Sequence, residues 1–346
     1  MKKRFLSLLC VLALCLGLLP VTALAAEGAP GSLYVAGQQI TDEGYYTQSG
    51  GNWTKSGGAS TPPSAPYFHY TKGNDNTPAT LTLSGATIQG GTSTGTVPYG
   101  AGIYAQCSNG QSVTLTIKLI GENTITGYYG IYVNAEISAD SYGTDASLTI
   151  TSENNGSLEV SGSNHGIFVK SGTGNASLNI EKATVTSSTD DVYAAGVNVQ
   201  SSANATGSPN ISLSVNGGSL TASGTGNSDG ILFYVGSSQA SDATTSLTVS
   251  KNAIMDARNG GIKASDSSMS DLSDQIKVSS GDGTNGGIVF DGTEGTVYGK
   301  VTLDESLTID QGETLTVPDG SKLDCKNNLT NKGTILVETG GTVSGN

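Results

Sequence analysis

One three-part pattern recurs seven times between Leu81 and Phe290, and it strongly limits what this chain can fold into. Each copy places a Leu-Thr-Ile-like segment, a Thr-Ile-like segment and a Gly-Ile-like segment in the same order. The Gly-Ile segments begin at intervals of 26 to 36 residues, at Gly102, Gly130, Gly166, Gly196, Gly230, Gly261 and Gly287. Self-similarity at this period is typical of a solenoid, in which each coil buries its apolar face against its neighbours.

The segments within each copy have the two-residue alternation of β-strands. Leu148 and Ile150 face one side of their segment and Thr149 faces the other, while Gly, Ser, Asn and Asp fill the connections. Stacking the Gly-Ile segments predicts an inward column of Ile103, Ile131, Ile167, Val197, Ile231, Ile262 and Ile288. The Leu-Thr-Ile segments predict a second column of Leu81, Leu115, Leu148, Leu178, Leu213, Leu247 and Ile276. Parallel strands about 4.8 Å apart would bury both columns in a narrow apolar core.

One corner of the predicted coil is short and nearly constant. The apolar residues that flank the connection between the first and second segments are 5 residues apart in four copies and 8 apart in two. The loops beside the Gly-Ile segments vary much more in length. The spacing therefore predicts a coil with one fixed corner and two variable corners.

The first 25 residues have the features of a secretory signal peptide. The basic start Lys2-Lys3-Arg4 precedes an apolar run over residues 5–19, and Ala23-Leu24-Ala25 supplies small residues for cleavage. The apolar run is too short for a stable membrane anchor. We therefore expect a secreted protein, either extracellular or at the cell surface, with no membrane insertion.

The charge of the chain argues against a nucleic-acid partner. Removal of residues 1–25 leaves 13 basic and 29 acidic residues, a net charge of −16, which would repel a phosphate backbone. Abundant Ser, Thr, Asn and Gly with few charges is also the composition of a disordered stalk. The regular apolar columns favour a folded solenoid over that alternative.

We place the repeat in residues 77–300. The segments on either side of it are expected to cover the ends of the solenoid. Residues 26–76 contain the only Trp, Trp53, and a group of Tyr and Phe residues. We interpret them as an N-terminal cap over open strand edges, with Trp53 favoured as cap core over ligand platform. Residues 301–346 have shorter strands punctuated by Gly, which predicts narrow C-terminal coils.

Two cysteines, Cys107 and Cys325, remain after the signal peptide is removed. Six coils separate them, and at about 4.8 Å per coil this exceeds the reach of a disulfide. We therefore expect two unpaired thiols.

With the columns placed, the chain resembles the right-handed parallel β-helix class typified by pectate lyase-like proteins. Phrases such as Leu81-Thr82-Leu83-Ser84-Gly85-Ala86-Thr87-Ile88 and Leu119-Ile120-Gly121-Glu122-Asn123-Thr124-Ile125 are similar to those of secreted bacterial β-helix surface proteins, some of which are regarded as carbohydrate-binding. The resemblance covers roughly residues 33 to 346. It implies the fold, and it implies that the Gly-Ile segments form the face on which the enzymes of this class bind polysaccharide.

The outward positions of the Gly-Ile segments carry three successive aromatic residues, Tyr104, Tyr132 and Phe168, here called the aromatic strip. Asn198, Leu232, Lys263 and Val289 continue the same outward column. Aromatic faces at the coil spacing suit stacking on successive sugar rings, with hydroxyl groups and Asn supplying polar contacts. Tyr99, Tyr128 and Tyr129 lie at loop ends beside the strip, so the predicted carbohydrate-binding residues are Tyr99, Tyr104, Tyr128, Tyr132, Phe168 and Asn198. The alternative is a ladder that stabilises neighbouring strands or lies under an N-terminal loop.

The sequence gives little support to a hydrolase. An enzyme similar to polygalacturonases needs Asn-x-Asp, Asp-Asp, Gly-His-Gly and Arg-Ile-Lys motifs in that order. Asp190-Asp191 is the only adjacent aspartate pair, His165 precedes it, and the Arg-Ile-Lys motif is missing. His165 is therefore favoured as a corner residue over a catalyst.

A polysaccharide lyase is the second enzymatic alternative. Lys263 is the best-placed base on the outward column, with Arg258 near it in sequence, because a lyase removes a proton beside a uronate carboxylate. The column neighbours Leu232 and Val289 contribute no carboxylate that would hold calcium against the uronate. The sequence therefore favours a protein without catalytic residues.

Metal sites have weak signals in this chain. Asp190-Asp191, Asp229 and Asp282-Gly283-Thr284-Asn285 leave calcium binding open, although most of these aspartates are expected to shape turns. The two histidines, His69 and His165, lie far from the two remaining cysteines, which argues against zinc and against a nucleophilic triad.

The sequence as a whole predicts a secreted, monomeric parallel β-helix that binds an extracellular polysaccharide or a host or cell-surface glycan without cleaving it, as a carbohydrate-binding or adhesin-like protein. A polysaccharide lyase or glycoside hydrolase and a purely structural surface spacer are the alternatives.

Overall fold

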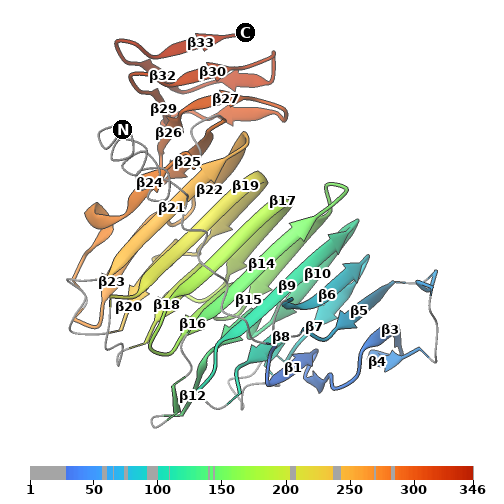
Figure 1. Cartoon of the computed structure of the whole chain (residues 1–346). Coiled ribbons are helices and arrows are strands. Elements are labelled where there is room, and N and C mark those ends of the chain that lie inside the picture. The colour runs from blue at the N-terminus through green and yellow to red at the C-terminus, as the bar shows by residue number, and fades with distance from the viewer. Residues whose placement is uncertain are drawn as a thin grey trace, which may run out of the picture.

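The computed structural model describes residues 29–56, 61–64, 66–73, 77–91, 100–108, 110–138, 141–142, 145–202, 208–236, 243–268, 270–281 and 285–345. The chain is an all-β protein whose parallel coils stack into a β-solenoid, as predicted (Figure 1). The solenoid has about five turns, so the predicted number of seven long coils is not confirmed. The predicted signal peptide, residues 1–25, lies outside the described residues. No helix in the described part of the chain is long and apolar enough to cross a membrane.

The Gly-Ile segments form the first face of the solenoid. Six parallel strands stack there in chain order: β8 (Ala101–Gln106), β11 (Tyr129–Asn134), β16 (Ile167–Ser171), β18 (Ala195–Ser201), β20 (Asp229–Val235) and β23 (Ile262–Asp266). Their register aligns Ile103, Ile131, Ile167, Val197, Ile231 and Ile262. The first six members of the predicted column are therefore confirmed.

The other two segments of each copy form the second and third faces. The second face contains β6 (Ala79–Ser84), β9 (Val113–Ile120), β14 (Ala146–Ser152), the first halves of β17 (Ala176–Thr189) and β19 (Asn210–Ser223), β21 (Thr244–Ser250) and β24 (Lys277–Ser279). The third face contains β7 (Thr87–Gln89), β10 (Glu122–Gly127), β15 (Ser157–Gly162), the second halves of β17 and β19, β22 (Ala253–Ala257) and β25 (Gly287–Asp291). A hairpin of β12 (Glu136–Ser138) and β13 (Ser141–Tyr142) projects beyond the first face, and the one-turn helix η2 spans Ser273–Gln275.

The second predicted column is correct in its middle and wrong at both ends. Leu115, Leu148, Leu178, Leu213 and Leu247 align as expected. Leu81 aligns instead with Ile117, one alternation further on, and Val278 takes the place predicted for Ile276. A two-residue slip keeps the same side of the strand inward, so the alternation alone does not distinguish these registers.

The fixed corner lies between the second and third faces, and the backbone bends there through left-handed residues. Positive φ angles occur at Gly85 (57°), Gly121 (63°), Asn155 (52°) and Lys182 (54°) in four successive coils. Gly and Asn adopt this conformation with little strain, which explains why the corner is short and rich in those residues.

The Gly that opens each of the first five Gly-Ile segments is needed for space, whereas Gly261 of the sixth segment has a positive φ of 71°. A Cβ at Gly130 would lie 2.2 Å from Val160 Cγ1 and 2.6 Å from the Gly166 carbonyl oxygen. A Cβ at Gly102 would lie 2.4 Å from Ile125 Cγ2. The first-face strand therefore starts pressed against the end of the third-face strand, and only glycine permits this approach.

An antiparallel cap covers the N-terminal edge of the solenoid. β1 (Ser32–Val35) pairs with β8 and with β2 (Gln38–Gln39), while β5 (Tyr67–Thr71) pairs with β6 and with β3 (Gly44–Ser49), which also pairs with β4 (Asn52–Lys55). Trp53 is 1% exposed and its ring lies 4.9 Å from that of Phe68. Trp53 is thus part of the hydrophobic core, which was the favoured prediction.

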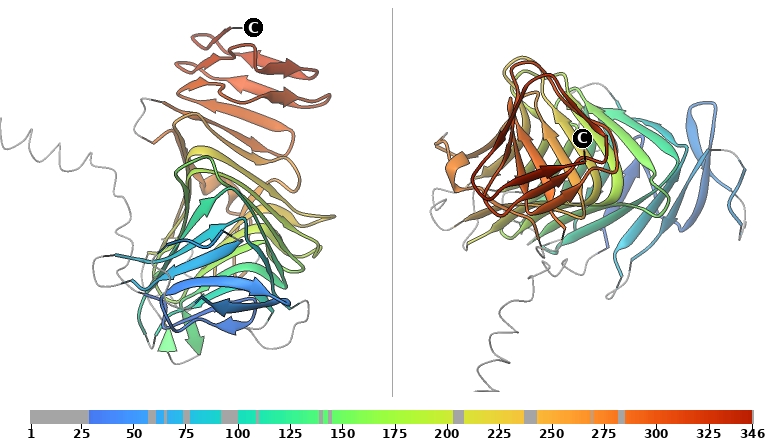
Figure 2. Two further views of the ribbon diagram at one scale, coloured as in Figure 1. Left: turned by 90° about the vertical axis from the view of Figure 1, so that its right-hand side faces the viewer. Right: turned by 90° about the horizontal axis from the view of Figure 1, so that it is seen from above.

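The C-terminal coils are narrower and form a triangular stack when seen end on (Figure 2). They consist of β26 (Glu294–Tyr298), β27 (Lys300–Thr302), β28 (Leu307–Ile309), β29 (Thr314–Val317), β30 (Lys322–Asp324), β31 (Leu329–Asn331), β32 (Thr334–Val337) and β33 (Thr342–Ser344). Their apolar side chains form a second core, separate from that of the wide coils.

The seventh Gly-Ile segment does not belong to the first face. Ile288 on β25 aligns with Ile254 on the third face, not with Ile262. Val289, predicted to point outward, is 5% exposed and packs in the wide core, whereas Ile288 packs in the narrow core. The last two Gly-Ile segments start 26 residues apart, which suggested one full coil. The chain needs almost as many residues to pass from the first face to the third face of one coil, because Ile231 and Met255 are 24 residues apart.

Cys107 and Cys325 are both free and buried, as predicted. Cys107 packs in the wide core and Cys325 in the narrow core. Burial raises the pKa of each thiol, so both stay protonated and are poor nucleophiles at neutral pH.

Candidate functional site

The aromatic strip forms on the outer side of the first face. Tyr104, Tyr132 and Phe168 occupy equivalent positions on β8, β11 and β16, and Asn198 continues the column on β18. The rings of Tyr132 and Phe168 stack with centroids 4.7 Å apart and planes 7° apart. The ring of Tyr104 lies 5.3 Å from that of Tyr132.

The rings of the strip are covered, which the sequence had left open. Tyr104, Tyr132 and Phe168 are 3%, 7% and 7% exposed, and with Ala101 they form a small apolar cluster outside the main core. Tyr34 from the cap and Tyr129 pack on this cluster, and the Tyr129 ring lies 4.8 Å from that of Tyr132. The strip therefore packs as a ladder between coils, and a sugar ring reaches its faces only if the covering side chains move.

A second outward row lies beside the strip, and of its members the sequence had placed only Tyr129 there. It consists of the residues that precede each Gly-Ile glycine, among them Tyr129, His165 and Asp229. These residues lie two positions before the buried residue of each segment, so simple alternation would place them on the inward side. The glycine next to them faces inward instead, so the preceding residue turns outward. A repeated Gly at the start of a strand was the available signal.

His165 connects this row to the strip. Its Nδ1 accepts a hydrogen bond of 3.0 Å from the Ala195 N–H, and its Nε2 lies 3.3 Å from the Asn198 amide nitrogen. Its ring centroid is 4.8 Å from that of Phe168. Burial lowers the pKa of His165 to about 4, opposed by the Ala195 backbone contact and by the charge of Asp191. The ring is therefore neutral at pH 7.

The tautomer of His165 determines what Asn198 can do. Because Nδ1 accepts a hydrogen bond, the neutral ring carries its proton on Nε2, and an amide with its oxygen turned toward Nε2 accepts a hydrogen bond from that N–H group. In the arrangement observed, Asn198 Oδ1 is buried without a hydrogen-bond partner among the described residues. Such an orphan group costs roughly 1–3 kcal/mol. Asn198 thus carries unused hydrogen-bonding capacity beside the strip.

The loops that lead into the first-face strands are joined to one another by hydrogen bonds. We call four of their residues the loop edge: Tyr128, Asn164, Asp191 and Tyr193. The Asn164 N–H donates to the Tyr128 carbonyl over 2.8 Å, and Asn164 Nδ2 donates to Asp191 Oδ2 over 3.3 Å. Asp191 Oδ1 accepts a hydrogen bond of 2.9 Å from the Tyr193 N–H. Tyr193 is 90% exposed, and Tyr128 is half-buried with its ring 4.9 Å from that of Tyr129. Tyr99 lies outside the described residues.

The structure brings together one pair that the hydrolase alternative invoked. His165 and Asp191 lie close enough for the carboxylate to raise the pKa of the imidazole. Both oxygens of Asp191 accept hydrogen bonds within the loop edge, and His165 Nδ1 is engaged by backbone. These contacts fix the shape of the loop edge, which agrees with the favoured role of His165 as a corner residue.

The residues of the lyase alternative have separate partners. Lys263 Nζ forms an ion pair of 2.6 Å with Asp229 Oδ1 across the coil boundary. Arg258 lies on the third-face side, where its guanidinium contacts Asp256 at 3.0 Å and Glu313 at 3.1 Å and sits 3.8 Å from the centroid of the Phe290 ring. Arg258 therefore ties the wide coils to the narrow coils.

Metal ligands do not converge in the described part of the chain. No group of three or more His, Cys, Asp or Glu side chains is placed there to hold a metal ion. Asp229 pairs with Lys263 and Asp191 takes part in the loop edge, while Asp282, Gly283 and Thr284 of the other calcium candidate lie outside the described residues.

The lowered pKa of His165 predicts a specific dependence of stability on pH. An unfolded chain protonates this imidazole near its ordinary value of about 6.5, whereas the folded protein resists protonation until about pH 4. The contribution is fully present above pH 6.5 and is lost as the pH falls toward 4, on the order of 1 kcal/mol per pH unit. We expect the unfolding free energy of the wild type to fall relative to that of His165→Gln across this window, measured by urea denaturation. A constant difference from pH 7.5 to 4 would show that His165 titrates normally.

Comparison with protein-family models, with curated proteins and with solved structures finds no match.

Proposed function

We propose that this chain is a secreted, non-catalytic carbohydrate-binding protein that engages an extended extracellular polysaccharide along the loop edge. The observation that carries the proposal is Tyr193, whose ring is 90% exposed on a loop held by hydrogen bonds to Asp191 and Asn164. A tyrosine presents an apolar face and a hydroxyl with little loss of side-chain entropy, which suits the apolar face and polar rim of a sugar.

The spacing of the loop edge supports an extended ligand. Tyr128 and Tyr193 belong to loops two coils apart, roughly 10 Å along the solenoid axis. Asn164 lies between them and is partly exposed, so polar and aromatic residues alternate along the axis. In this proposal the covered strip supports the loop edge from below and Tyr129 joins the two.

The charge distribution favours a neutral glycan over an acidic one. Asp191 belongs to the loop edge, Asp190 directly precedes it, and the whole chain has a formal net charge of −13. A polyuronate would be repelled by these negative charges, whereas a neutral polysaccharide would not. The preference for neutral glycans also separates the proposal from the lyase alternative, whose substrate is a uronate.

Tyr193→Ala and Tyr128→Ala are expected to weaken binding to a retained neutral polysaccharide by about two- to tenfold each, the scale of an aromatic contact of 0.5–1.5 kcal/mol. Affinity electrophoresis in gels of increasing glycan content measures this change. Leu336→Ala provides the control, because Leu336 is also exposed (50%) but lies on β32 in the narrow coils. If the double tyrosine variant is retained as strongly as the wild type, the loop edge is not the binding surface.

A further inference from the structure

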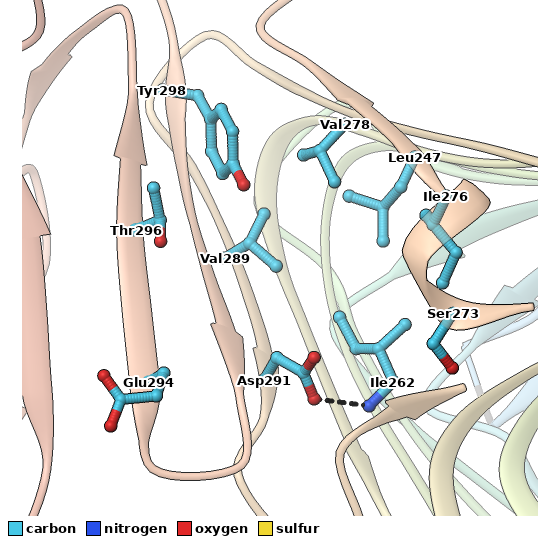
Figure 3. Close-up of a pocket in the computed structure, with 10 residues that line it drawn as sticks. All are labelled: Leu247, Ile262, Ser273, Ile276, Val278, Val289, Asp291, Glu294, Thr296 and Tyr298. Carbon is cyan, nitrogen blue, oxygen red and sulfur yellow. Dashed lines mark hydrogen bonds between the residues drawn. The ribbon is translucent and has the colours of Figure 1, made fainter. Parts of the chain in front are cut away.

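A cavity of about 260 Å³ opens where the wide coils end and the narrow coils begin (Figure 3). We call it the junction cavity. Its walls come from β21, β23, β24, the segment around η2, and the β25–β26 hairpin. It lies on another part of the molecule from the loop edge, and no residue of the proposed glycan site lines it.

The cavity exists because the narrow coils continue only one side of the wide solenoid. β25 pairs in parallel with β22 and turns back antiparallel into β26, so the third face is extended. β23 and β24 pair only with the preceding coil among the described strands. Apolar side chains that a further wide coil would cover therefore line an opening, among them Leu247, Ile262, Val278 and Val289.

The interior of the cavity is aliphatic. Leu247, Ile262 and Val289 are members of the wide core with exposures of 0%, 7% and 5%, and Ile276 and Val278 pack against that core from the outer side. In Figure 3 these side chains point toward a common space, with the Tyr298 hydroxyl entering it from the opposite strand. An apolar chain placed there would be removed from water on several sides.

The rim of the cavity is acidic without a basic counterpart. Asp291 and Glu294 lie directly opposite each other across the β25–β26 hairpin, an arrangement of like charges that costs stability. Asp291 Oδ1 accepts a hydrogen bond of 2.7 Å from the Ile262 N–H, and neither carboxylate forms an ion pair among the described residues. No Lys or Arg lines the cavity. Asp291 also raises the pKa of Tyr298, after burial as the larger cause.

We propose that the junction cavity is a binding site for a small amphipathic cation, an alkylammonium whose chain fills the aliphatic interior and whose ammonium group lies at the Asp291–Glu294 rim. A cation at the rim relieves the repulsion between the two carboxylates, whereas an anionic head group increases it. The volume lies just below the range of about 300–1,000 Å³ for drug-sized ligands, so the chain is short. Aliphatic walls favour a hydrocarbon chain over a sugar ring, which needs more polar partners.

The test titrates the whole chain with n-butylammonium, n-hexylammonium, 1-hexanol and hexanoate, using isothermal calorimetry or chemical shift changes. The proposal expects n-hexylammonium to bind most tightly, 1-hexanol more weakly and hexanoate most weakly. Each added methylene between butyl and hexyl should strengthen binding about fourfold, the scale of burying one methylene. Equal binding of n-hexylammonium and hexanoate, or no binding of n-hexylammonium up to millimolar concentration, overturns the proposal.

Three variants separate the rim from the interior. Asp291→Asn and Glu294→Gln should each weaken n-hexylammonium binding about two- to fivefold and leave 1-hexanol unchanged, the effect of losing one partly exposed ion pair. Glu338→Gln removes an exposed carboxylate of the narrow coils and should change neither ligand. Val278→Phe fills the interior and should abolish binding of both ligands. If Asp291→Asn and Glu294→Gln weaken the binding of n-hexylammonium no more than Glu338→Gln does, the rim assignment is wrong. This comparison holds even if Val278→Phe fails to fold.

Discussion

Ile231→Lys is expected to unfold several coils of the wide solenoid at once. Ile231 is fully buried, with Val197 before it and Ile262 after it in the first-face column. Burial of an unpaired ammonium costs several kcal/mol, and in a solenoid each coil contributes to the stability of its neighbours. Urea denaturation followed by circular dichroism should show a loss of about 3–5 kcal/mol, or no folded state at all.

Thr149→Lys is the matched control for this prediction. Thr149 lies on β14 between Thr116 and Asn179, and its side chain points away from the core. A lysine there keeps its ammonium in water, so the unfolding free energy should change by less than about 0.5 kcal/mol. Similar stabilities for the two lysine variants would contradict the inward register of the first face.

Phe168→Ala is expected to destabilise the fold, although Phe168 points away from the main core. The ring is 7% exposed and packs against Tyr132, Tyr129 and His165. Removal of a buried phenylalanine ring leaves a cavity and costs about 3–5 kcal/mol. The change is measured by the same urea denaturation.

Tyr193→Ala serves as the aromatic control for Phe168→Ala. Tyr193 is 90% exposed, so its removal should change stability by less than about 0.5 kcal/mol. The pair of variants distinguishes a packing ladder from a binding face. If Phe168→Ala keeps the stability of the wild type and loses glycan retention, the strip itself binds sugar and the loop edge does not.

The apolar repeat was enough to predict the fold because it is local and redundant. Six Gly-Ile segments align on one face, and five leucines align on the next. The errors occur where the repeat meets a different structure, at Leu81 beside the cap and at Ile276 and Ile288 beside the narrow coils. Leu81 and Ile288 lie on strands that also pair antiparallel with β5 and β26, and Ile276 ends the one-turn helix η2. The pattern of a single segment does not reveal these neighbours.

The candidate site was predicted only in part, because exposure depends on what packs above a face. The alternation correctly placed Tyr104, Tyr132 and Phe168 in one outward column, yet it contains no information about the Tyr34 and Tyr129 side chains that cover them. Tyr193 was not singled out, since it lies in a loop outside the repeated phrases. The junction cavity arises from the change of coil width, which no single segment encodes.

The role of the protein is tested most directly by measuring retention on a panel of neutral and acidic polysaccharides alongside product release from the same panel. We expect the wild type to be retained by at least one neutral polysaccharide, to release no product from any of them, and to lose retention in the Tyr128→Ala, Tyr193→Ala double variant. Release of unsaturated or reducing sugars that depends on Lys263 or His165 would contradict the non-catalytic proposal. The absence of retention on every polysaccharide would contradict glycan binding and favour a structural spacer.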